Sequence, residues 1–473
     1  MPPRPDLPQI PLRSGPPRGM LTPLEWPDHV ARMGVVLGLV TFLAGLLLMG
    51  FEGTENILPF VLITLLAGSG TVVLYLAIRE AGDARFLKTL IVGAVLLRLG
   101  LTLVFHHLLP VGFFAPDAFT FQDAGWRTLL YLQGEGARPR QIAGTFEAGY
   151  FFWNAALYWV FGFLPLAPKL FNAFFGAWTS LLAYRLAGEL AGRTPARIAG
   201  ALVGFFPSLV LWSTQNLRDG PVLTLLVAII LLAHRLRNRW STPGLVLLLT
   251  LIFVVGTLRD YMAVMVVFAL LGTFLITPAR ALSTNLLLAI ALVVTALVAY
   301  DQLGLGSRWV ESASLEFVDE QRRALATGGT AFGTTEELED PVESLRYLPI
   351  GVTYFLFAPF PWELESFLSR MTFPEMILWY GLMLLVPRGV WYLLRNRFTA
   401  VEPILLFLLI TVPTYGLVEG NAGTAYRHRS QVIAFFLILA AVGIAVRRDR
   451  KRHRGSRGPR PTLQIQRSDP ALR

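Results

Sequence analysis

The chain has 473 residues, of which 54% are hydrophobic and only 15% are charged. Soluble proteins carry about 25% charged residues, so this composition excludes an ordinary soluble enzyme and predicts a polytopic membrane protein. The net charge of +10 does not indicate a nucleic-acid partner, because the basic residues gather in short loops and in the tail, and the lack of cysteine excludes disulfides and thiolate chemistry.

Long apolar stretches begin after a Pro-rich segment, residues 1–29, which has no apolar core and does not resemble a signal peptide. Twelve stretches are long enough to cross a bilayer as helices. Together they predict one all-α membrane domain over residues 30–446, followed by a basic tail over residues 447–473. The predicted spans are 31–50, 57–78, 87–109, 168–190, 196–214, 219–236, 242–257, 261–277, 284–300, 374–393, 400–418 and 429–446.

Two further apolar stretches, 148–165 and 347–361, are predicted to be interfacial helices on the outer side of the membrane. This assignment leaves the arginine-rich loops on the cytoplasmic side, as the positive-inside rule expects. If both stretches crossed the membrane, the arginines of 235–239 would face outward. We therefore predict a multi-pass protein of the plasma (inner) membrane, with both termini in the cytoplasm.

This topology places the unusual polar clusters on the extracytoplasmic side. They lie in a loop over 110–148 that continues as the interfacial helix to 165, in short turns at 215–219 and 258–261, in the segment 301–346, and in the loop 419–428. Loops as long as 110–148 are uncommon unless they are functional. Polar groups gathered on one membrane face predict a single reaction site there.

The first loop contains two candidate catalytic carboxylates, Asp117 and Asp123. A carboxylate near an apolar surface can act as a general base or a metal ligand, because burial and neighbouring charges shift its pKa. Asp117 follows Pro116, which is equally typical of a turn or a helix cap. Both interpretations of Asp117 remain open.

The two short turns repeat an Arg-Asp pair. Arg218-Asp219 precedes Gly220-Pro221, so Asp219 fits either a helix cap or a carboxylate that faces the same cavity as Asp117. Arg259-Asp260-Tyr261 fits either a site element or a local ion pair. These pairs add Asp219 and Asp260 to the candidate site residues.

The last outer loop contains basic residues where the topology predicts few. Arginine forms planar, bidentate contacts with phosphate oxygens, and two glycines in this loop let a ligand approach the backbone. The alternative is that these side chains reach lipid headgroups. We favour a phosphate ligand, bound by Arg427 and Arg429. Further candidates are Arg98 within the span 87–109, Glu147 at the end of the first loop, and Asn421, Tyr426 and His428 beside the two arginines.

In order and topology, these motifs resemble the GT-C superfamily of integral membrane glycosyltransferases. The resemblance is to bacterial relatives of the protein O-mannosyltransferases (glycosyltransferase family 39) and of the aminoarabinose transferases, and it is best over residues 87–280. Asp117-Ala118-Phe119-Thr120-Phe121 is similar to the family motif Asp-x-x-x-Tyr, with Phe in place of Tyr. Gly149 through Gly162 is similar to the interfacial helix, and Phe206 through Asp219 to the approach to the second aspartate.

Three departures accompany the resemblance. Two extra helices precede the first family helix, and Ala118 replaces the second acidic residue after Asp117. Glu147 stands where some relatives carry a basic residue for the donor phosphate.

The resemblance implies a membrane glycosyltransferase that moves a sugar, with inversion, from a polyprenyl-phosphate donor to an extracytoplasmic lipid, glycan or protein. Asp117 would accept the proton of the acceptor, with Asp123 and Asp219 as alternatives, and Arg218, Arg259, Arg427 and Arg429 would bind the phosphate. No cofactor is certain; a divalent metal occurs in the superfamily, but no ligand set here is specific for one. The expected partners are the donor and membrane lipid, and the acceptor stays unknown.

Two other functions fit the sequence less well. An oligosaccharide polymerase or ligase would use lipid-diphosphate-linked glycans and depend more on the arginines than on Asp117. A lipid or sugar transporter would show repeated halves and polar groups near the midplane. The chain shows no internal repeat, and its polar candidates lie at one face.

Overall fold

The computed structural model describes residues 25–52, 55–80, 82–143, 147–276, 315–326, 332, 340–364 and 367–455. In these ranges every regular element is a helix, which confirms the all-α fold class. The predicted span 284–300 and most of the segment 301–346 lie outside the described residues.

The first part of the chain forms the helices up to the end of the described stretch at residue 276. Their bounds are α1 (Trp26–Glu52), α2 (Ile57–Ile78), α3 (Ala84–Leu108), α4 (Asp117–Leu132), the short 3-10 helix η1 (Arg140–Ile142), α5 (Gly149–Phe161), α6 (Leu166–Ala191), α7 (Arg193–Phe205), α8 (Pro207–Trp212), α9 (Asp219–Asn238), α10 (Thr242–Leu258) and α11 (Asp260–Ile276).

The second part contains α14 (Leu315–Leu325), α15 (Pro341–Phe357), α16 (Phe367–Met383), α17 (Val386–Asn396), α18 (Phe398–Val418), α19 (Ala422–His428) and α20 (Ser430–Gly455). The basic tail therefore begins as a helix, because α20 continues past the predicted boundary at residue 446.

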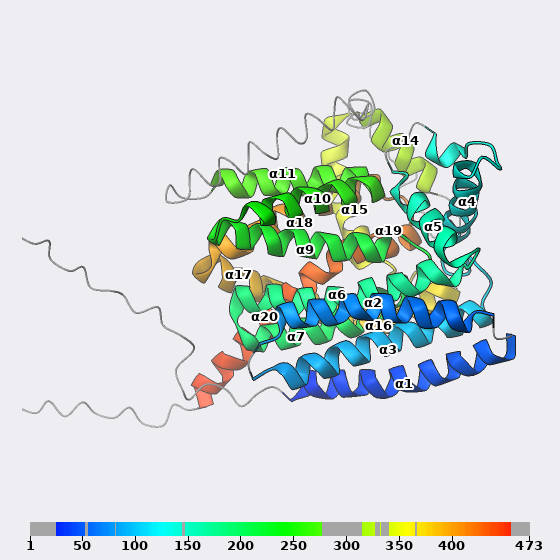
Figure 1. The fold of residues 1–473 in the computed structure, drawn as a ribbon. Coiled ribbons are helices and arrows are strands. Elements are labelled where there is room, and N and C mark those ends of the chain that lie inside the picture. Colours follow the sequence, from blue (N-terminus) through cyan, green and yellow to red (C-terminus); the bar gives the residue numbers. More distant parts are fainter. Residues whose placement is uncertain are drawn as a thin grey trace, which may run out of the picture.

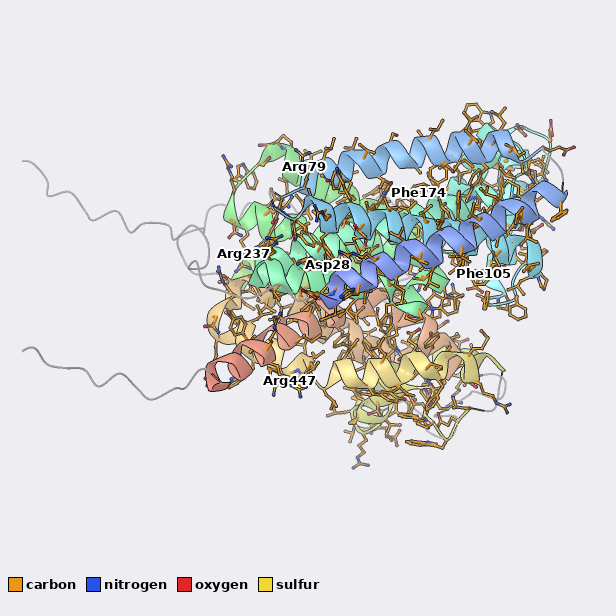
Figure 2. The ribbon with its side chains drawn as sticks, turned by 90° about the horizontal axis from the view of Figure 1, so that it is seen from below. Asp28, Arg79, Phe105, Phe174, Arg237 and Arg447 are labelled. Atoms are coloured by element: carbon orange, nitrogen blue, oxygen red, sulfur yellow. The ribbon has the colours of Figure 1, made fainter. Side chains whose placement is uncertain are left out.

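Most long helices run side by side along one direction, and α4 and α5 cross one end of the bundle (Figure 1). Helix α1 begins, and α20 ends, at the opposite end (Figure 1). Figure 2 places Arg79, Arg237 and Arg447 at that same opposite end, and Phe105 at the end near α4 and α5. The arginine-rich ends of the helices and the outer loops predicted from the sequence are thus separated along the bundle.

Seven helices in the described ranges are long and apolar enough to cross a membrane, or eight if α5 and α6 form one bent span. The predicted number of about twelve is not confirmed by this count. Helices α10 and α11 are apolar but shorter than a full span. The angle of 117° between α5 and α6 means that the aromatic stretch 148–165 does not continue α6 as a straight helix.

The predicted span 196–214 is not one continuous helix. The chain bends at Phe206, where α7 ends and α8 begins with Pro207. Proline has no N–H to continue the helical hydrogen bonds, so carbonyl groups of the preceding turn need other donors. Arg98 from α3 supplies one, since its Nη1 atom donates to the Gly204 carbonyl at 2.7 Å.

In the core of the bundle, α20 packs against helices whose ends lead into the predicted outer turns. Residues 432–442 of α20 are buried against side chains of α7, α9 and α18. Helix α15 lies very close to α18, because a Cβ atom at Gly351 would be 1.8 Å from the Gly416 carbonyl oxygen. Any side chain at position 351 would push these helices apart, so glycine is required there. This packing fixes the end of α18, where the last outer loop begins.

Candidate active site

Asp219 is the centre of a charged cluster at the start of α9. Its side chain is only 1% exposed, and its Oδ1 atom accepts a hydrogen bond from Arg259 Nη2 at 2.7 Å. Its Oδ2 atom accepts two bonds from Arg427, from Nη2 at 3.0 Å and from Nε at 3.1 Å. The N-terminus of a helix also favours a negative charge. Asp219 is therefore a fixed, fully bonded carboxylate.

Arg427 also reaches a second carboxylate. Its Nη1 atom donates to Asp117 Oδ2 at 2.6 Å, and Asp117 is the first residue of α4. The Asp117 side chain is 55% exposed, whereas that of Arg427 is 11% exposed. One arginine thus joins α19, α9 and α4 and brings together three of the site residues predicted from the sequence.

Arg259 is held on its other side by tyrosines. It lies between α10 and α11, is buried, and donates to the Tyr261 hydroxyl as well as to Asp219. The Tyr261 hydroxyl is 3.2 Å from that of Tyr415 in α18. Tyr415 in turn donates to Gln431 in α20 at 2.9 Å. This chain of hydrogen bonds fixes Arg259 between three helices.

Arg218 forms a second ion pair beside the cluster. Its Nη1 atom donates to Glu147 at 3.0 Å and to the Leu258 carbonyl at 2.7 Å. The backbone N–H of Asp260 donates to the other Glu147 oxygen at 3.2 Å. Burial opposes ionisation, but Arg218 and the hydrogen bonds outweigh it and keep the pKa of Glu147 below its ordinary value. The carboxylate of Glu147 therefore balances the charge of Arg218 at neutral pH.

The loop 419–428, predicted without a helix, contains the short helix α19. Asn421 caps it, because its side-chain oxygen accepts the backbone N–H groups of Gly423 at 2.7 Å and Thr424 at 3.3 Å. Buried Glu419 accepts the Thr424 hydroxyl at 2.8 Å and bonds the imidazole of His428. These contacts fix the orientation of the helix that carries Arg427.

Arg429 is not part of this cluster. It is buried, donates to the Ala358 carbonyl and to Met376 Sδ, and lies over the ring of Tyr426 at 5.5 Å. Residues two apart in a helix are separated by about 200° around its axis, so Arg427 and Arg429 face opposite directions. Tyr426 donates to Glu375 at 2.8 Å. The expected pairing of Arg427 and Arg429 on one phosphate therefore has no support from this arrangement.

Two other predicted site residues also lie apart from the cluster. Asp123 forms an exposed ion pair with Arg127 one turn later in α4, at 2.9 Å. Arg98 is fully buried and donates through Nε to Ser213 at 2.9 Å and through Nη1 to Gly204. Its contacts hold α3 to the bend between α7 and α8.

A buried amide network beneath the turn 215–219 was missed by the sequence analysis. Asn172 Nδ2 lies 2.8 Å from three acceptors, the carbonyls of Gln215 and Leu217 and the Tyr150 hydroxyl, and its two N–H groups are shared among them. Tyr150 donates to Asn216, which donates to Asn154. The signal was present, since Asn172 is an amide inside the apolar span predicted over 168–190. The network fixes the turn that leads into Asp219.

No three Asp, Glu or His side chains converge on a point that could bind a metal ion, within the part of the chain that the structure describes. Asp117 and Asp219 lie close together, but an arginine lies between them. In the described structure the two carboxylates of the cluster are therefore both bonded to arginine.

A comparison with protein families agrees with the resemblance to membrane glycosyltransferases that the sequence motifs suggest. The family described as dolichyl-phosphate-mannose-protein mannosyltransferase matches residues 149–300, about a third of the chain. No curated protein matches. The family match includes Asp219 and Arg259, and it supports a multi-pass membrane glycosyltransferase of the GT-C type.

Proposed function

We propose that this protein transfers a sugar from a polyprenyl-phosphate donor to a hydroxyl group of an extracytoplasmic acceptor. The observation that carries the proposal is the position of Arg427, which holds a buried carboxylate on one side and an exposed carboxylate on the other. The exposed carboxylate is a proton acceptor, and the guanidinium beside it suits a phosphate. Both groups required for this transfer are therefore at one place.

Asp117 is the proposed general base. Of the two carboxylates that the described residues place on Arg427, Asp117 is the one open to solvent, because Asp219 is buried and has both oxygens bonded. In the reaction, Asp117 takes the proton of the acceptor hydroxyl as its oxygen forms a bond to the anomeric carbon. The bond from that carbon to the phosphate oxygen breaks on the opposite side, and the configuration inverts.

Arg427 is the proposed stabiliser of the leaving lipid phosphate. The phosphate gains negative charge as the sugar–oxygen bond breaks, and a fixed N–H donor aimed at such charge contributes about 3 kcal/mol to the transition state. Asp219, Arg259 and the cap at Asn421 keep Arg427 in place. Asp219 is thus assigned to positioning rather than to proton transfer.

The proposed reaction face is the end of the bundle that bears α4 and α5. The arginines at the opposite end, among them Arg79, Arg237 and Arg447 (Figure 2), favour a cytoplasmic location for that end under the positive-inside rule. Both termini would then be cytoplasmic, and the cluster around Asp219 would face the extracytoplasmic side of the plasma membrane.

Turnover by the purified protein tests this function. Labelled polyprenyl-phosphate sugars and candidate acceptors are incubated with the wild type, with Asp117→Asn, and with Glu135→Gln as a control for an exposed acid of the same outer loop. We expect release of lipid phosphate by the wild type and the control, and a loss of about 10²–10⁴-fold in Asp117→Asn. Full activity of Asp117→Asn would refute its role as base. Turnover with lipid-diphosphate donors alone would replace the proposed donor class.

A further inference from the structure

The guanidinium of Arg427 has two edges with different surroundings. The edge formed by Nε and Nη2 bonds Asp219, which is 1% exposed and also bonded to Arg259. The remaining Nη1 atom bonds Asp117, which is 55% exposed. One edge is therefore built into the protein interior, and the other is at the surface.

The two ion pairs differ accordingly in strength. An ion pair with a solvated partner contributes little, whereas breaking a buried pair by removing one partner is costly because it leaves an uncompensated buried charge. An incoming anion thus displaces Asp117 far more easily than Asp219. The contact with Asp219 keeps the guanidinium oriented while its Nη1 atom changes partner.

The same Nη1 atom is what the proposed reaction needs for the donor phosphate. Nη1 carries two N–H groups, and Asp117 occupies one of them at the exposed end of the guanidinium. A phosphate that binds at this end needs the same place and carries the same sign of charge, so the proposed base and the donor compete for it. Asp117 Oδ2 accepts an N–H of Arg427, so the lone pair that it uses is engaged and the carboxylate is held against the guanidinium. In the arrangement observed, Oδ2 is thus restrained as a base.

We propose that Arg427 is an exchange residue: the donor phosphate replaces Asp117 on Nη1, and this exchange releases Asp117 to deprotonate the acceptor. The inference rests on the proposed function and adds an order to it, with the donor bound before the base becomes active. Without donor, Asp117 stays paired with Arg427, so a bound acceptor is not deprotonated in the absence of a sugar to receive it.

The exchange predicts an unusual effect on the affinity for the lipid phosphate. Removing the catalytic carboxylate should tighten the binding of the lipid phosphate, because Asp117 no longer competes for Arg427. The competing contact is an exposed ion pair, so we expect Asp117→Asn and Asp117→Ala to bind about two- to fivefold more tightly than the wild type. Glu135→Gln, which removes an exposed acid elsewhere in the same loop, should leave the affinity unchanged.

The experiment measures the binding of a short-chain polyprenyl monophosphate to the full-length protein in detergent, with the corresponding polyprenol as a blank. A double-mutant cycle separates exchange from simple charge repulsion. In an Arg427→Gln background, Asp117→Asn should no longer tighten binding, because the contested N–H is gone. Thermal unfolding of each variant checks that it is folded.

Three results would overturn the inference. Unchanged or weaker binding by both Asp117 variants would show that no competition exists. Equal tightening in the Arg427→Gln background would show that Asp117 only repels the phosphate through space. If the wild type binds the monophosphate no better than the polyprenol, the proposed donor class fails as well, and this result is distinct from the first two.

Discussion

The burial of Asp219 predicts that Asp219→Asn loses unfolding free energy whether or not a substrate is bound. Asparagine at position 219 has nearly the same shape but no charge, so Arg259 is left buried without its counter-ion. Both side chains are 1% exposed, and removing one partner of such a pair costs about 3–5 kcal/mol of unfolding free energy. Asp123→Asn, in the exposed pair with Arg127, is the matched control and should cost at most about 1 kcal/mol.

A second substitution tests the cause of the loss. In the double variant Asp219→Asn/Arg259→Gln the orphaned charge of Arg259 is also removed, while Arg427, the other partner of Asp219, keeps its contact with Asp117. The loss should therefore be smaller than the sum of the two single losses by about 1–3 kcal/mol. Unfolding in mixed detergent micelles, followed by the fluorescence of the 11 tryptophans, measures these differences. Additive losses, or an Asp219→Asn variant as stable as Asp123→Asn, would refute the assignment of a buried pair.

Three further outcomes follow from other contacts. Glu147→Gln should be less stable than the wild type at neutral pH, and the difference should shrink as the pH falls. The lowered pKa of Glu147 gives a contribution that is present above its ordinary pKa and lost as the pH falls through the lowered one; unfolding of both proteins over a series of decreasing pH values follows it, and a difference that grows in acid would contradict it. Asn421→Ala should lower the unfolding free energy by about 1 kcal/mol and reduce turnover. Asn421→Ser should retain both stability and turnover, since serine also caps helices. A larger effect of serine than of alanine in unfolding and activity assays would contradict this. Because the chain has no cysteine, single cysteines at the exposed positions Pro116 and Glu135 should react with an impermeant maleimide in intact cells, and one at Asn238 only after permeabilisation; the reverse pattern would invert the topology.

The all-helical membrane fold could be predicted from the sequence because long apolar runs leave few alternatives in a membrane, but the predicted number of about twelve spans is not confirmed. The bend at Phe206 could not be placed by hydropathy, since the apolar run continues through Pro207. Proline marks the place, but the sequence does not show what bonds the carbonyl groups that the end of α7 leaves open. One of them, the Gly204 carbonyl, is bonded by Arg98, more than a hundred residues earlier in the chain.

The members of the cluster were partly predictable. Asp117, Asp219 and Arg427 are polar residues in turns between apolar spans, and the topology placed those turns on one face. Their selection from among similar neighbours depended on local geometry. A loop over 419–428 favours Arg427 and Arg429 acting together, but the helical backbone of α19, which extends to its C-cap Arg429, directs the two side chains apart. The spacing of Asp123 and Arg127, one helical turn, already indicated their local pairing.

The long distance along the chain between Asp117 and Arg427 has a consequence for biosynthesis. Asp219 and Arg259 flank the hairpin of α9 and α10, so they can neutralise each other as soon as that hairpin has entered the membrane. Arg427 lies three residues before α20, the last helix of the described residues, so it takes its place when α20 is inserted. A nascent chain in which α20 is not yet inserted therefore carries a protected charge pair that is not yet joined to Asp117. Completion of the proposed reaction site is tied to insertion of α20.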